Sequence, residues 1–158
     1  MCKSRRSAFT LIEVLIVVII MAVLAATIIP QFSSSTKDAR MSNLSFNLQT
    51  IRSQLEMYKE HHAGVYPPAA TSADFTNQMT QKTDSTTTLN ANGLYGPYIQ
   101  TAVPVNPFNN SNSVVILSGG TMPSAATGSA DGWQYNPAQG WFYPNTANYF
   151  TSGGSVLQ

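Results

Sequence analysis

The sequence has little cysteine, histidine or charge, and each shortage excludes a class of protein. Its 158 residues include one cysteine, Cys2, so neither an internal disulfide nor a cysteine-ligated zinc site is available. Only 9% of the residues are charged, and the chain offers no basic patch for nucleic acid. It also contains no phosphate-binding glycine-rich loop that ends in lysine. We therefore expect neither an enzyme nor a nucleic-acid partner.

The chain does contain one long apolar run near its N-terminus. Between Val14 and Ile29 the only polar side chain is Thr27, and roughly 20 helical residues suffice to cross the ~30 Å hydrocarbon core of a bilayer. Basic residues precede the run, which by the positive-inside tendency places that end in the cytoplasm. These residues are Lys3, Arg5 and Arg6. The pattern predicts one membrane-spanning helix with the rest of the chain outside the cytoplasm.

Glu13 stands at the start of this run and needs an explanation. A charge at the centre of a bilayer costs about 2.5–3.5 kcal/mol on insertion scales, so an ionisable group in such a segment indicates a function. A cleavable signal peptide is one alternative, with Ala25 and Ala26 as small residues near its cleavage site. The apolar run continues past them to Ile29, which disfavours that alternative. An uncleaved simple anchor is the other alternative.

The stretch SAFTLIEVLIVVIIMAVLAATIIPQF closely resembles the prepilin signal of the type IV pilin family, which includes the pseudopilins of type II secretion systems. The resemblance implies cleavage between Ala8 and Phe9 and N-methylation of Phe9. Glu13 is then the fifth residue of the mature chain, as in the family, and Pro30 falls where many members also have proline. Ala8 departs from the family, which normally has glycine before the cut.

The same resemblance implies an organisation and a set of partners. Residues 1–8 form the leader, residues 9–30 the transmembrane and filament-core helix, and residues 31–158 a periplasmic globular domain. Glu13 is expected to pair with the Phe9 amine of a neighbouring subunit, and pairing within its own chain is the alternative. The implied partners are further copies of the chain, other pseudopilins, the prepilin peptidase and methyltransferase, the inner-membrane assembly platform, and membrane lipid before assembly.

Beyond the apolar run, the spacing of hydrophobic residues predicts that the helix continues. Apolar side chains recur every three or four residues on one face, at Met41, Leu44, Leu48, Ile51, Leu55 and Tyr58. We expect one helix from Phe9 to about His62, kinked rather than ended by Pro30, and closed by Gly64. The apolar stripe is expected to pack on the following domain; a coiled-coil dimer is the alternative.

His61 and His62 are adjacent, so they project about 100° apart on a helix and cannot share one ligand. They are also the only imidazoles that could serve a serine nucleophile. We expect both to be solvated, or to interact favourably with the C-terminal end of the helix dipole.

The remaining sequence predicts a small antiparallel sheet packed on the C-terminal half of the helix, and hence an α+β fold. Residues 71–92 are rich in threonine, serine and asparagine and predict a surface loop. The β-branched residues 113–118 predict a strand, and two aromatic runs within 132–145 predict a hairpin. We expect its aromatic side chains to belong to the core; a stacking platform for sugars or bases is the alternative. These are Trp133, Tyr135, Trp141 and Tyr143.

Two further stretches, GVYPP at 64–68 and GLYGPYIQTAVPVNPFNN at 93–110, resemble the major pseudopilins of type II secretion. The resemblance implies a filament subunit; a minor pilin, a tip adhesin or DNA-uptake subunit, and a singly anchored surface-binding module are the alternatives. Major pseudopilins are known as a group for a calcium site in a C-terminal acidic loop. The corresponding loop here contains one acid, Asp131, as its calcium candidate. We expect no cofactor.

Overall fold

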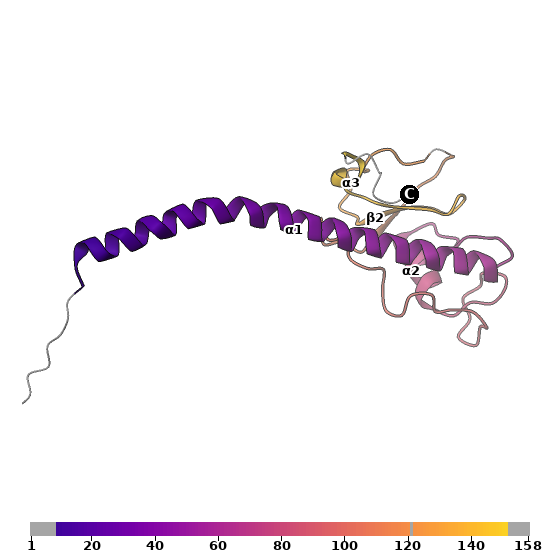
Figure 1. The fold of residues 1–158 in the computed structure, drawn as a ribbon. Helices are drawn as coiled ribbons and strands as arrows, with labels where there is room; N and C mark the ends of the chain where they lie inside the picture. Colours follow the sequence, from indigo (N-terminus) through magenta and orange to yellow (C-terminus); the bar gives the residue numbers. More distant parts are fainter. Residues whose placement is uncertain (1–8, 121, 152–158) are drawn as a thin grey trace, which may run out of the picture. The chain divides into compact units, whose positions relative to one another are not determined.

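The computed structural model describes residues 9–120 and 122–151. The chain divides into two compact units, Met1–Ala39 and Arg40–Gln158, and the boundary between them falls inside the long helix α1 (Leu11–His61). The second unit contains two further helices and three strands (Figure 1). They are α2 (Ser72–Thr80), β1 (Val114–Ile116), β2 (Trp133–Asn136), β3 (Trp141–Pro144) and the short α3 (Ala147–Thr151).

Helix α1 confirms the predicted long helix, because it continues through Pro30. Its C-terminal end is closed near Gly64, as predicted, by the N–H of Gly64, which donates to the carbonyl of Lys59 at 2.9 Å. The left-handed backbone begins one residue earlier, at Ala63 with φ 53°, and Gly64 follows with φ 87°. The chain therefore reverses through two left-handed residues, of which only the second is the glycine that such a conformation favours.

The predicted apolar stripe of α1 is buried within the second unit. Five of its residues are at most 1% exposed, and Met41 packs on them from the edge. They are Leu44, Leu48, Ile51, Leu55 and Tyr58. The periodicity therefore identified the core-facing side of this half of α1 correctly, and the stripe packs on the chain's own domain.

Helix α2 corrects the prediction of a loop over residues 71–92. Thr71 and Asp74 form a capping box, in which the Thr71 hydroxyl accepts from the Asp74 N–H and the Asp74 carboxylate accepts from the Thr71 N–H. Phe75 and Met79, one turn apart, are fully buried. A polar composition concealed this helix, although the Thr-x-x-Asp signature and the i, i+4 apolar pair were present in the sequence.

The sheet is mixed, so the prediction of a purely antiparallel sheet was wrong. Strands β2 and β3 form the predicted antiparallel hairpin, but β1 pairs with β2 in parallel, with Val114 opposite Trp133. Parallel neighbours need a crossover of a dozen or more residues, and residues 117–132 supply it. Hydrophobic alternation indicates that a strand exists but not the direction in which it pairs.

The hairpin delivers some of its aromatic side chains to the core but not all. Trp133 and Tyr135 are fully buried, and the Trp133 indole N–H donates to the carbonyl of Pro104 at 2.8 Å. Phe142 is buried on β3, whereas its neighbours Trp141 and Tyr143 are half-buried. Tyr143 packs at the edge of the core, but Trp141 lies outside it, against expectation. Successive residues of a strand point to opposite faces, so when Phe142 points into the core its two neighbours point away from it.

Candidate functional site

Glu13 occupies the third position of α1, which begins at Leu11. Its carboxylate oxygen Oε2 accepts from the backbone N–H of Thr10 at 2.8 Å and from the Thr10 hydroxyl at 2.7 Å. The Glu13 N–H lies 3.4 Å from the same hydroxyl, so the two residues form a capping box. We did not predict this contact, although the Thr-x-x-Glu spacing indicates it. Within the chain, the carboxylate therefore sits at the N-terminal end of the helix, where the dipole favours a negative charge.

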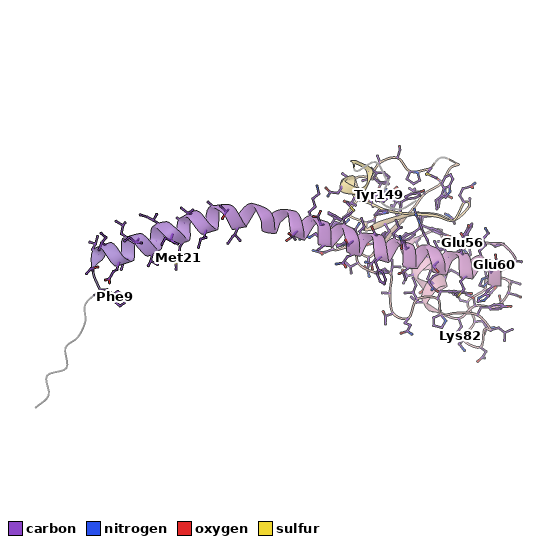
Figure 2. The ribbon with its side chains drawn as sticks, in the orientation of Figure 1. Phe9, Met21, Glu56, Glu60, Lys82 and Tyr149 are labelled. Carbon is purple, nitrogen blue, oxygen red and sulfur yellow. The ribbon has the colours of Figure 1, made fainter. Side chains whose placement is uncertain are left out.

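The surface that follows Glu13 is apolar on every side of the helix. The large hydrophobic side chains from Val14 to Ile28 are between 46% and 64% exposed. Figure 2 shows side chains that project both above and below α1 between the labelled Phe9 and Met21. The only polar side chain here, Thr27, donates its hydroxyl to the carbonyl of Leu24 at 2.9 Å. Leu11–Ile28 is long and apolar enough to cross a membrane.

The other residues predicted for processing and assembly lie at different places. Phe9 is 88% exposed, two residues before α1 begins. Ala8 lies outside the described residues. Pro30 lies inside α1, although its ring is not among the side chains that the structure describes. The structure thus places Phe9 and Glu13 at the same end of one helix, while their proposed pairing across subunits stays a prediction.

Comparison with known proteins supports the predicted resemblance of the N-terminus to a prepilin signal. Residues 3–29 match the family model described as the prokaryotic N-terminal methylation motif. The chain is 37% identical over 59 residues to a type II secretion system core protein G of Pseudomonas aeruginosa, and this stretch is 37% of the chain and 42% of the relative. The N-terminal segment thus carries the methylation motif and is similar to that of type II secretion system core proteins G.

Two further relatives carry the same name. The type II secretion system core protein G of Aeromonas hydrophila is 32% identical over 59 residues, or 37% of the chain and 41% of the relative. That of Dickeya chrysanthemi is 33% identical over 57 residues, or 36% of the chain and 37% of the relative. The chain thus spans about two fifths of the length of the relatives it matches. No solved structure matches the chain significantly. The relatives' names describe core proteins of a secretion system.

Of the two histidines, His61 is exposed in the last turn of α1, as expected, whereas His62 is not. His62 is buried, not solvated, and stacks on Tyr58 with ring centroids 3.8 Å apart. Its Nδ1 lies 2.7 Å from the carbonyl of Tyr58, which can only accept, so Nδ1 carries a proton. Its Nε2 lies 2.9 Å from the hydroxyl of Thr83. His62 therefore fastens the end of α1 to the segment that follows α2, while the exposed His61 contacts Tyr98 through Nδ1.

A shallow groove of about 280 Å³ lies beside the hairpin, and Tyr66, Trp141 and Tyr143 are among its lining residues. The Tyr66 hydroxyl donates to Glu56 at 2.8 Å and accepts from the Lys59 ammonium at 3.3 Å. Burial, followed by the bond to Glu56, raises the pKa of Tyr66, and the bond to Tyr66 raises the pKa of Lys59. Tyr66, Glu56 and Lys59 thus bind one another within the domain.

Asp131, the calcium candidate, belongs to the crossover between β1 and β2. Among the residues described by the structure, no group of three histidine, cysteine or acidic side chains could hold a metal ion. The carbonyl of Asp131 accepts from the side-chain amides of Asn109 at 2.9 Å and Asn145 at 3.1 Å. Sequence reasoning missed both asparagines, because nothing in their spacing indicates that they converge on this loop.

Proposed function

We propose that the chain is a structural subunit of a type IV pilus-like filament, the pseudopilus of a type II secretion system. The observation that carries the proposal is the helix surface from Val14 to Ile28, which is apolar all round and is preceded by an acidic cap at Glu13. Such a surface requires lipid or other apolar helices around it, and a filament of copies supplies them. The names of the relatives and the methylation motif support this assignment.

In this proposal the apolar helix serves first as a membrane anchor and then as the filament core. Lipid tails are as apolar as leucine, so moving the helix from lipid to sister helices gains little from the hydrophobic effect. Packing and polar pairing must then drive and position the transfer. Leader removal by the prepilin peptidase gives Phe9 a free amine, and Glu13 of the adjoining subunit is its proposed partner. A charge that is unfavourable when unpaired thereby sets the register of assembly.

The second unit of the chain is proposed to lie in the periplasm. The basic residues before the apolar run favour the opposite side, the cytoplasm, for the N-terminus. The subunit would wait in the inner membrane, meet the assembly platform and other pseudopilins there, and enter the filament with its globular domain outward. The filament would then push folded substrates toward an outer-membrane channel.

Mass spectrometry of the chain purified from cells with an active prepilin peptidase tests the proposal. We expect an N-terminus at N-methylated Phe9. A start near Thr27 would indicate a signal peptide instead, and an intact Met1 would indicate a simple anchor. An Ala8→Gly variant is the matched control for cleavage, because it restores the family's usual residue before the cut and is expected to be processed at least as fast.

A secretion assay separates the pseudopilus from other filaments. Deletion of the gene for the chain is expected to leave substrates in the periplasm, and a reintroduced copy that keeps Phe9 and Glu13 is expected to restore their export.

The copy number of the chain then distinguishes a major from a minor subunit, since a major subunit exceeds the other pilin-like proteins of the same cell in a quantitative immunoblot. Normal export without the chain contradicts the secretion assignment.

A further inference from the structure

The crossover of residues 117–132 allows β1 and β2 to pair in parallel, and it has almost no buried side chains among its described residues. Its described residues are exposed or half-buried except for Gly132. Met122, its largest described apolar side chain after Leu117, is 56% exposed. A segment of this length loses much conformational freedom when it is ordered, so some other set of interactions must fix its path.

Side-chain amides from outside the crossover supply those interactions. Each of five amide groups donates from its nitrogen to a backbone carbonyl of the crossover, and the carbonyls are spread along its length. The pairs are Asn136 with Gly119 at 2.6 Å, Gln134 with Ala125 at 3.0 Å, Asn145 with Ser129 at 3.4 Å and with Asp131 at 3.1 Å, Asn109 with Asp131 at 2.9 Å, and Asn106 with Gly132 at 2.8 Å. Asparagine and glutamine thus hold the segment that apolar side chains do not.

Asn145 is the centre of this set, and it is only 4% exposed. Its Oδ1 accepts from the N–H of Thr127 at 2.8 Å, from the Thr127 hydroxyl at 3.2 Å and from the amide of Gln134 at 3.1 Å. Its Nδ2 donates to the carbonyls of Ser129 and Asp131 and lies 3.0 Å from the Ser129 hydroxyl. The buried Asn145 carboxamide therefore makes hydrogen bonds with both donors and acceptors of residues 127–131.

The residues around this point do not fit the calcium ion that the family resemblance implies for the loop. Calcium takes six to eight oxygen ligands, normally including several carboxylates. The crossover contains one carboxylate, Asp131, and the carbonyls of Ser129 and Asp131 already accept from N–H donors. A cation at the same point would face the hydrogens of Asn145 Nδ2, which carry partial positive charge. The groups around this point therefore suit a side-chain carboxamide and do not suit a metal ion.

We infer that the carboxamide of Asn145 takes the place of a bound cation in this chain, so that the crossover and the domain fold without calcium. The inference does not depend on the proposed filament function, because it rests only on contacts within the second unit. It makes Asn145 the residue on which the order of residues 127–131 depends.

The test uses the full chain in detergent micelles and begins with the unmodified protein. Thermal unfolding is followed by tryptophan fluorescence, once with EDTA and once with millimolar calcium chloride. The expected midpoints agree within about 1 °C, because a ligand that does not bind the native state cannot raise its stability. A midpoint several degrees higher in calcium would overturn the inference. This measurement stands whether or not any variant folds.

Two variants of Asn145 then separate its accepting and donating roles, with the exposed Asn112 as matched control. Asn145→Ala removes both, and it is expected to lower the midpoint by roughly 5–10 °C and to abolish exchange protection of the Thr127 amide. Asn145→Asp keeps the acceptor but not the donor, so the Thr127 amide stays protected while the midpoint falls. Asn112→Ala is expected to change neither. An Asn145→Ala midpoint equal to that of the control contradicts the inference.

Discussion

The carboxylate of Glu13 accepts two hydrogen bonds from Thr10, one from its backbone N–H at 2.8 Å and one from its hydroxyl at 2.7 Å. A charged group at the start of a membrane-length helix thus has a partner before any neighbouring subunit arrives. The contact stabilises the helix end and keeps the carboxylate at the N-terminus of α1. Glu13 therefore acts as a helix cap within the chain, and its pairing with the Phe9 amine of another subunit is a second, proposed role.

Variants of these two residues separate the cap from the intersubunit pair. Glutamine can replace glutamate in a capping box but carries no charge, so Glu13→Gln preserves the cap and removes the proposed ion pair. We expect it to enter the membrane normally but to lower filament yield roughly tenfold or more, since a loss of ~1.4 kcal/mol changes an equilibrium tenfold. Thr10→Val removes the capping hydroxyl and keeps the charge, and near-normal yield is expected. Sheared-filament immunoblots measure the yield, and the opposite ranking would assign Glu13 to the cap alone.

Two large apolar residues of α1 are expected to respond very differently to truncation. Leu48 is fully buried among the core residues, and Leu48→Ala should reduce the free energy of unfolding by about 2–5 kcal/mol. Phe46, two positions earlier, is 69% exposed, so Phe46→Ala should cost less than about 1 kcal/mol. Denaturant unfolding of the full chain in micelles compares the two. Equal losses would mean that the stripe of α1 does not face the core.

Glycine is required at the end of the crossover for reasons of space. A Cβ atom at Gly132 would overlap the carbonyl of Ser111, whereas one at Gly120 would meet open space. Gly132→Ala is expected to cost roughly 1–3 kcal/mol or more, because the overlapping atom is backbone and cannot rotate away. Gly120→Ala is the matched control and should be near neutral. Denaturant unfolding measures both variants, and an unchanged free energy of unfolding in Gly132→Ala would show that the crossover can shift to make room for the added atom.

The cap of α2 should be sensitive to acid. Hydrogen bonds from the Thr71 hydroxyl and from backbone N–H groups lower the pKa of Asp74, against a smaller opposing effect of desolvation. Because the folded-state pKa is depressed, this contribution to stability is complete above the ordinary value of about 3.9 and is lost as the pH falls through the lower folded-state pKa.

Hydrogen exchange at the Asp74 amide between pH 5 and pH 2 measures this loss locally. A local readout is needed because the pKa of Asp84 is also lowered, chiefly by Thr86. Asp74→Asn is expected to remove most of the acid dependence within α2 while leaving that of the Asp84 turn. An unchanged profile in the variant would mean that the capping carboxylate does not control the start of α2.

Much of the fold followed from local patterns. The long helix, its apolar stripe, its end near Gly64 and the β2–β3 hairpin depend on periodicity and turn residues within short stretches of chain. The same kind of pattern was present for α2, where Thr71 and Asp74 bracket a capping box, but its polar composition outweighed it. That error was one of weighting, because the information lay in the sequence.

Other features depended on contacts between distant residues. His62 meets Thr83 across 21 positions, Asn145 meets Asp131 across 14, and Val114 of β1 lies opposite Trp133 in parallel. No spacing rule connects such pairs, since each is brought together only when the core closes. The burial of His62, the direction of β1 and the amide-held crossover were therefore not predictable from local patterns.

The sequence by itself determined that this chain has an apolar helix with a carboxylate at its start, because composition and order alone decide whether a segment can lie in a membrane. Only the tertiary structure decided which polar groups hold the domain together. Asparagine side chains look alike in a sequence, and their roles depend on which carbonyls the fold places within reach of each amide.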